Sequence, residues 1–84
     1  MREIEIRDRI VTMVATALEV GADGVDVDAE LASLGLSSIQ AFTLTGDLAE
    51  WLDQELPTTL MWEHPTIRRL AAHLAGYGTE VGGA

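Results

Sequence analysis

Two adjacent serines, Ser37 and Ser38, stand in the heptapeptide LGLSSIQ that spans residues 34–40. A serine hydroxyl can act as a nucleophile when a histidine and an acid activate it. The sharp turn that presents such a nucleophile in α/β-hydrolases has glycine two residues after the serine. Ile39 and Gln40 occupy those positions here. The pair therefore does not form a hydrolase motif, and we expect no catalytic residue in this chain.

The same residues have the pattern of a helix start. Ser37 and Gln40 are spaced as in a capping box, in which the N-cap hydroxyl bonds the third helical amide and the third side chain bonds back to the cap. Ser37 is then the cap, which is typically worth about 1 kcal/mol. Ser38 falls on the first helical position, and we expect its hydroxyl to face solvent.

Metal-binding patterns are incomplete in this chain. A calcium loop that begins at Asp26 would place Asp28 and Glu30 correctly, but it has Leu31 where glycine is needed and Ser37 where a bidentate glutamate is needed. The two histidines, His64 and His73, are nine residues apart, and the chain has no cysteine. We therefore expect no metal site, with His64 in a turn and His73 on the solvated side of the last helix.

Charge is distributed unevenly along the 84 residues, whose net charge is −9. Residues 10–67 contain ten carboxylates and no Lys or Arg, and the five arginines lie near the ends of the chain. Such a surface repels nucleic acid and anionic membranes, and it attracts basic patches on other proteins. Solubility alone is an equally good explanation of the acidic surface. The first ten residues contain no apolar run, so we expect a soluble cytoplasmic protein.

The apolar pattern predicts an all-α domain, a small bundle of three main helices and one short helix. The main helices are expected over 2–18, from Ser38 to Leu52, and after Thr66, which can cap the last one. A short turn over 60–63 lies between Pro57 and Pro65. The long acidic loop between the first two helices has one expected turn over 29–33. We assign residues 1–76 to the domain and 77–84 to a flexible Gly-rich tail.

The second helix also has features of a docking surface. Phe42 lies off the apolar stripe and is expected to be partly exposed beside Ile39, with acidic residues around the pair, including Asp47 and Glu50. The alternative is that the pair covers the edge of the core. Gly46 costs about 1 kcal/mol inside a helix, and it either leaves a notch that a partner side chain could fill or is a tolerated defect. The two tryptophans, Trp51 and Trp62, could be aromatic platforms for a ligand, but we expect them to be packing residues, which is the commoner role.

Beyond these patterns, LGLSSIQ resembles the Leu-Gly-Leu-Asp-Ser-Leu signature of acyl carrier proteins, in which the serine carries 4'-phosphopantetheine. The resemblance covers most of the chain. The run LPTTLMWEHPTIRRLAAHLAG is especially similar to carrier domains of polyketide synthases. Peptidyl carriers tend to show Gly-Gly-His/Asp-Ser, whereas this chain has Leu34, Gly35 and Leu36. The resemblance therefore favours acyl over peptidyl substrates.

The resemblance implies a function in which Ser38 holds covalent 4'-phosphopantetheine and the domain shuttles acyl thioesters without catalysis of its own. The rest of the motif is Gly35, Leu36, Ser37 and Ile39. Implied partners are a phosphopantetheinyl transferase, an acyltransferase or fatty acyl-AMP ligase that loads the arm, and a ketosynthase or other synthase domain. We expect a monomer. TLTGDLAEWL is similar to carriers that accept a starter unit.

One departure from the family pattern is Ser37, which replaces the usual aspartate. Both residues are good N-caps, so the helix start is retained. The lost carboxylate could help to position the transferase or its metal ion, so modification is expected to be slower or to need a particular transferase. Two alternatives stay open: a peptidyl carrier of a non-ribosomal peptide synthetase, and an acidic helical adaptor that is never modified.

Overall fold

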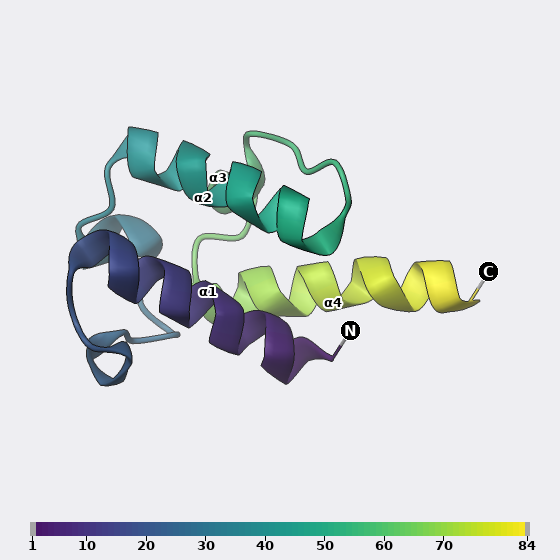
Figure 1. Ribbon diagram of the computed structural model, residues 1–84, viewed down its shortest axis with the longest axis horizontal. Helices are drawn as coiled ribbons and strands as arrows, with labels where there is room; N and C mark the ends of the chain where they lie inside the picture. The colour runs from purple at the N-terminus through teal and green to yellow at the C-terminus, as the bar shows by residue number, and fades with distance from the viewer. Residues whose placement is uncertain (1, 84) are drawn as a thin grey trace.

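The structure is a computed structural model that describes the backbone of residues 2–83 and the side chains of residues 2–76. Its helices are α1 (Glu3–Leu18), α2 (Ser38–Leu52), α3 (Leu60–Glu63) and α4 (Ile67–Gly83) (Figure 1). Two 3-10 turns, η1 (Ala22–Gly24) and η2 (Leu31–Leu34), lie between α1 and α2. Within residues 2–83 there is no strand, only an isolated bridge between Glu30 and Thr66. The predicted all-α bundle is confirmed.

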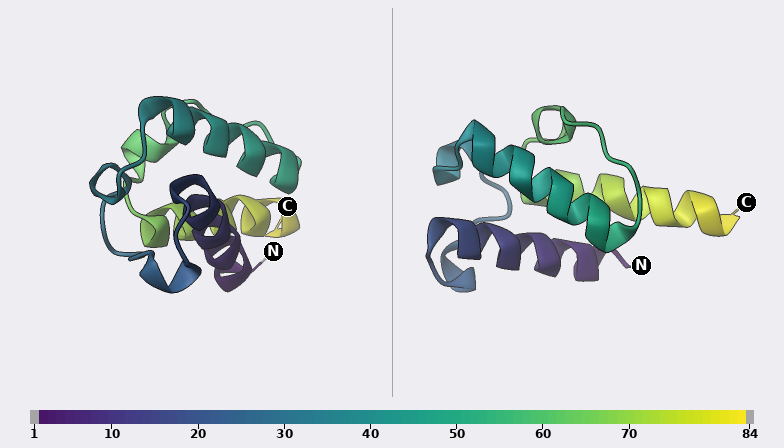
Figure 2. Two further views of the ribbon diagram at one scale, coloured as in Figure 1. Left: turned by 60° about the vertical axis from the view of Figure 1, so that its left-hand side comes forward. Right: turned by 45° about the horizontal axis from the view of Figure 1, so that its top comes forward.

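The helices enclose the core from several directions. α1 packs mainly against α4, and the two run in opposite directions, while α2 lies across them (Figures 1 and 2). α1 buries Ile6, Ile10 and Val14, which are spaced four residues apart on one face. The helix ends at Leu18, and the next residue, Glu19, adopts a left-handed conformation with φ 58°.

The long segment between α1 and α2 is fastened to the start of α4. The amide of Leu31 donates to the carbonyl of Pro65 at 2.8 Å, and the amide of Arg68 donates to the carbonyl of Val27 at 3.0 Å. The Arg68 guanidinium also lies 2.5 Å from an Asp28 carboxylate oxygen, and this hydrogen bond lowers the pKa of Asp28. The turn expected over 29–33 occurs slightly later, as η2.

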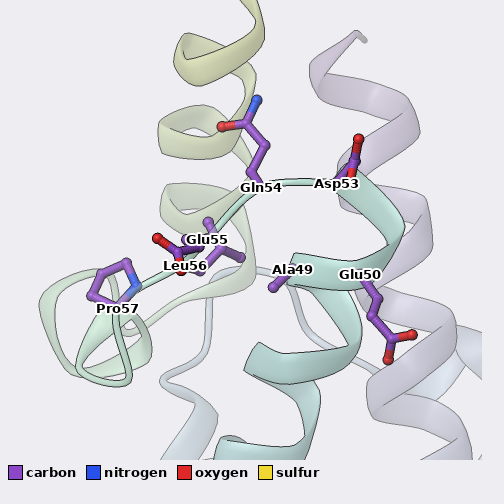
Figure 3. Close-up of a pocket in the computed structure, with 7 residues that line it drawn as sticks. All are labelled: Ala49, Glu50, Asp53, Gln54, Glu55, Leu56 and Pro57. Atoms are coloured by element: carbon purple, nitrogen blue, oxygen red, sulfur yellow. The ribbon is translucent and has the colours of Figure 1, made fainter.

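Beyond α2 the chain turns at Asp53 and continues past Pro57 to α3 (Figure 3). Asp53 adopts φ 54°, and the amide of Gln54 donates to the carbonyl of Ala49 at 3.0 Å, which closes the end of the helix. Thr59 stands at the cap position of α3. Its hydroxyl donates to the Glu63 carboxylate at 3.0 Å instead of accepting from the backbone.

α4 begins as predicted and continues farther than predicted. Thr66 caps it by accepting the Arg69 amide at 3.2 Å. The helix then runs to Gly83 and includes residues 77–83, which the sequence predicts to be part of a flexible tail. Extending an existing helix adds one hydrogen bond for each residue fixed, so its end can pass through a sequence that could not nucleate one. The expected domain boundary at residue 76 is therefore not a helix end.

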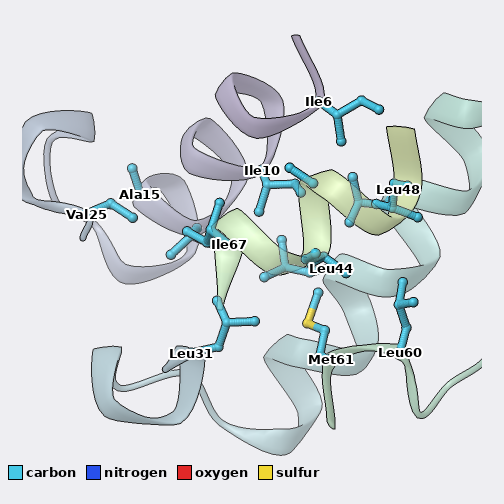
Figure 4. Close-up of a cluster of buried hydrophobic side chains, with 14 residues drawn as sticks. Ile6, Ile10, Ala15, Val25, Leu31, Leu44, Leu48, Leu60, Met61 and Ile67 are labelled. Atoms are coloured by element: carbon cyan, nitrogen blue, oxygen red, sulfur yellow. The ribbon is translucent and has the colours of Figure 1, made fainter. Parts of the chain in front are cut away.

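The core draws on every helix. Its side chains converge from α1, α2, α3 and α4, with Val25 and Leu31 of the connecting segment added to them (Figure 4). Leu44 and Leu48 are the buried leucines of α2, and α4 turns one apolar face toward the core. Its members are Ile67, Leu70, Ala71 and Leu74. This packing holds α2 in place along its length and sets the direction in which its first turn points.

Candidate functional site

Ser37 caps α2 in the predicted manner. Its hydroxyl accepts the amide of Gln40 at 3.1 Å, and its own amide donates to the Gln40 side-chain carbonyl at 2.9 Å. Both halves of the capping box are present. The Ser37 hydroxyl is therefore engaged with the backbone, which leaves the neighbouring serine as the one with an available hydroxyl.

Ser38 is the first residue of α2 and is exposed. Its hydroxyl makes no hydrogen bond to any residue that the structure describes. The first turn of a helix has unpaired amides and the positive end of the helix dipole, both of which favour a negatively charged group. A phosphate ester on this oxygen would thus lie in a favourable electrostatic environment.

Gly35 and Gln40 fix the backbone on either side of Ser38. Gly35 follows η2 with φ 100°, a conformation that side-chain-bearing residues rarely adopt. Gln40 reaches across from α2 to α1, where its side-chain nitrogen donates to the carbonyl of Ala17 at 3.2 Å. The capping pattern identified Gln40, but its link to α1 was not predicted.

A hollow of about 310 Å³ opens beside Ser38, between η2, the first turn of α2, and α3. Its walls are largely apolar, with Leu36, Met61 and Trp62 among them, and Glu30 is the ionisable residue that lines it. Trp62 is 68% exposed, so the expectation that it is a packing residue was wrong. Trp51 is half-buried, with the Arg9 guanidinium 5.2 Å from its ring centre.

The predicted docking residues lie on exposed parts of α2. Ile39 is 79% exposed and Phe42 is 63% exposed, so the pair does not cover the core. Asp47 and Glu50 are exposed farther along the helix. A methyl group built on Gly46 would meet nothing within 4 Å, so this glycine is not required by packing inside the chain.

Residues 8–74 match the family model described as "Phosphopantetheine attachment site". The chain belongs to this family. Members of this carrier family hold 4'-phosphopantetheine covalently and are not catalysts. The match covers α1 from residue 8 onward, all of α2 and α3, and the first half of α4, together with the serine pair.

Curated relatives of this carrier domain are much longer proteins. It is 41% identical over 73 residues to a phenolphthiocerol/phthiocerol polyketide synthase subunit of Mycobacterium tuberculosis, a match that covers 87% of the chain. It is 40% identical over 68 residues to 6-methylsalicylic acid synthase of Penicillium patulum, with 81% of the chain covered. The chain spans about 4% of the length of each relative. The resemblance to polyketide synthase carriers is confirmed.

A solved structure shares the fold. It is a free-standing peptidyl carrier protein from Acinetobacter baumannii, 36% identical to this carrier domain, with a TM-score of 0.86. The match covers 89% of this chain and 94% of the other. A type-II acyl carrier protein from Streptomyces verticillus, 26% identical over 90% of this chain and 89% of its own, has a TM-score of 0.80. The helical arrangement is therefore shared with both kinds of carrier, and the fold does not separate the two classes.

The two histidines of the carrier domain lie together. The ring of His64 stacks on the ring of His73, with a centroid distance of 4.0 Å. His73 is half-buried, so its expected place on the solvated side of the last helix was wrong. Partial burial lowers the pKa of His64, and the neighbouring His73 lowers it further. Helical spacing could not reveal this contact, because it joins the turn after α3 to the middle of α4.

A second concavity, of about 700 Å³, lies at the opposite end of α2 from Ser38 (Figure 3). It is lined by three acidic residues, Glu50, Asp53 and Glu55, and by the apolar residues Leu56 and Pro57. No group of three or more side chains suited to hold a metal ion occurs in the part of the chain that the structure describes. Within residues 2–83, no helix is long and apolar enough to cross a membrane.

Proposed function

We propose that the chain is an acyl carrier domain of a polyketide synthase and that Ser38 carries the phosphopantetheine arm. The observation that carries this proposal is the division of roles between the two serines: Ser37 is engaged in the capping box, while the Ser38 hydroxyl is exposed and unbonded within the described residues. The arm fits this position, because a phosphodiester needs a hydroxyl oxygen and is favoured at a helix N-terminus.

Ser38 takes part in the modification only as an acceptor. Its oxygen attacks the phosphorus of coenzyme A that bears the pantetheine, a new P–O bond forms, and the pyrophosphate P–O bond breaks. Adenosine 3',5'-bisphosphate leaves, and the hydroxyl proton passes to a base of the transferase. The bound arm then supplies the thiol that this cysteine-free chain lacks. The acyl group travels on that thiol as a thioester.

Partner enzymes are proposed to dock on α2. Phe42 supplies apolar contact, Gly46 leaves room for a partner side chain, and Asp47 and Glu50 attract basic patches. The partners are a phosphopantetheinyl transferase, an acyl-loading enzyme and a ketosynthase or other synthase domain. With a net charge of −9, the chain has no complementarity to nucleic acid or an anionic membrane.

We also propose how the domain works within a larger assembly. It acts as a non-catalytic monomer over residues 1–76, and it operates in the cytoplasm, because a reducing compartment keeps the thiol of the arm available for thioester formation. Loading with a starter unit is the specific role that the TLTGDLAEWL segment favours.

A peptidyl carrier is the second candidate, supported by the 36% identity to the Acinetobacter baumannii protein. Loading assays on the modified domain separate the two. We expect acyl transfer from an acyltransferase or fatty acyl-AMP ligase and no loading by an adenylation domain that activates amino acids. Aminoacyl loading without acyl loading would make the peptidyl carrier the better account.

A further inference from the structure

The Gln40 side chain uses both ends of its amide at once. Its carbonyl oxygen accepts the Ser37 amide at 2.9 Å, and its nitrogen donates to the Ala17 carbonyl at 3.2 Å. A backbone amide can only donate and a backbone carbonyl can only accept, so one orientation of the side chain satisfies both partners. Gln40 is therefore held in a single orientation by two different elements.

Both partners of Gln40 are groups that helix ends leave unpaired. Ala17 is the penultimate residue of α1, where carbonyls lose their partners in the helix, and Ser37 is the N-cap of α2. Gln40 thus joins the end of α1 to the start of α2 across 23 positions in the sequence. Ser38 lies between the two residues of the capping box, directly within the segment that this link holds.

We propose that Gln40 is a positioning residue for the Ser38 hydroxyl during phosphopantetheine transfer, through its link to Ala17. This inference rests on the proposed function of Ser38. The link fixes the first turn of α2 relative to α1, whereas the docking residues Phe42, Asp47 and Glu50 lie beyond that turn. Its loss should therefore misplace the acceptor oxygen while the docking surface stays intact.

The Gln40→Glu variant tests the bond to Ala17 separately from the capping box with Ser37. Glutamate at this position completes a capping box, and its charge is favoured near the helix N-terminus, so α2 keeps its start. The carboxylate cannot donate to Ala17. Gln40→Met keeps the length and neutrality of the side chain but loses both bonds. Gln54→Glu is the matched control, because it adds the same charge just beyond the other end of α2.

The experiment measures kcat and KM for modification of each folded variant by one phosphopantetheinyl transferase, with coenzyme A and magnesium. We expect kcat to fall about 5-fold in Gln40→Glu and Gln40→Met, with KM changed less than about 2-fold, because a misplaced acceptor lowers the rate of transfer from the bound complex. Gln54→Glu should match wild type. The loss in Gln40→Glu should persist at high salt, which excludes simple repulsion of the phosphate.

If Gln40 only stabilises the fold, its variants should change KM and not kcat. A carrier that is folded only part of the time raises the apparent KM in proportion and leaves kcat unchanged. That outcome, or wild-type kcat in both Gln40 variants, would overturn the positioning role while leaving the carrier function intact. A wild-type protein that is folded but never modified would overturn the proposed function itself, and the positioning role with it.

Discussion

His64 stacks on His73 at 4.0 Å, and this contact joins the turn after α3 to α4. Burial lowers the pKa of His64, as do the charges of His73 and Arg69, while Glu63 acts in the opposite direction. A histidine whose pKa is lower in the folded state binds fewer protons there than in the unfolded chain. Its contribution to stability is therefore complete above the unfolded pKa of about 6.5 and is lost as the pH falls toward the folded value.

This contact predicts a pH dependence of folding. The urea midpoint of the wild type should fall between pH 7.5 and pH 5. His73→Phe keeps an aromatic ring but removes one of the charges, so its midpoint should fall less over the same range. Denaturation followed by circular dichroism measures both. An equal fall in the two proteins would show that the histidine pair does not cause the dependence.

Alanine substitutions at Gly35 and Gly46 should change the stability of the domain in opposite directions. Gly35→Ala should destabilise the domain by about 1 to 2 kcal/mol, because φ 100° is strained for any residue with a side chain, although the new methyl group would meet only Leu18, at 3.9 Å. Gly46→Ala should stabilise it by about 0.5 to 1 kcal/mol, because α2 has open space there. Chemical denaturation of both variants tests the pair.

Gly46→Ala also tests the proposed notch. If a partner side chain enters there, the variant should be more stable than wild type yet a poorer substrate for that partner. Improved stability with unchanged loading would remove Gly46 from the docking surface.

Two substitutions of Ser37 should differ in their effects on stability and on the rate of modification. Ser37→Ala loses the cap and should destabilise the domain by about 1 kcal/mol. Ser37→Asp keeps an N-cap and should leave stability nearly unchanged. Because it restores the carboxylate that acyl carriers usually have before their modified serine, it should also speed modification. Parallel denaturation and transferase assays measure both effects. Slower modification of Ser37→Asp than of wild type would mean that the carboxylate has no favourable role in this chain.

Charge reversal on α2 should weaken partner binding. Asp47→Lys and Glu50→Lys are expected to raise KM for a partner enzyme several-fold at low salt, with a smaller effect at high salt. Asp23→Lys, in the exposed turn η1, makes the same change in net charge away from α2 and is the matched control. If KM rises equally in all three variants, net charge rather than a docking face would govern association.

Much of this architecture could be predicted from sequence, because apolar spacing and caps are local signals. Leu44 and Leu48 follow helical periodicity, and Ser37 and Gln40 form a local box. The signals that failed depend on distant partners. The link from Gln40 to Ala17 and the stack of His64 on His73 exist only once the helices pack. The end of α4 was missed because glycines predict a break, whereas an established helix can continue through them.

The most direct test of the account is the intact mass of the protein after incubation with coenzyme A, magnesium and a broad-specificity phosphopantetheinyl transferase. Wild type and Ser37→Ala should each gain one phosphopantetheinyl group, and a folded Ser38→Ala should gain none. Modification of Ser38→Ala would place the arm on another residue. The absence of any addition to folded wild type, with several transferases, would contradict the carrier function and leave an unmodified acidic adaptor as the better account.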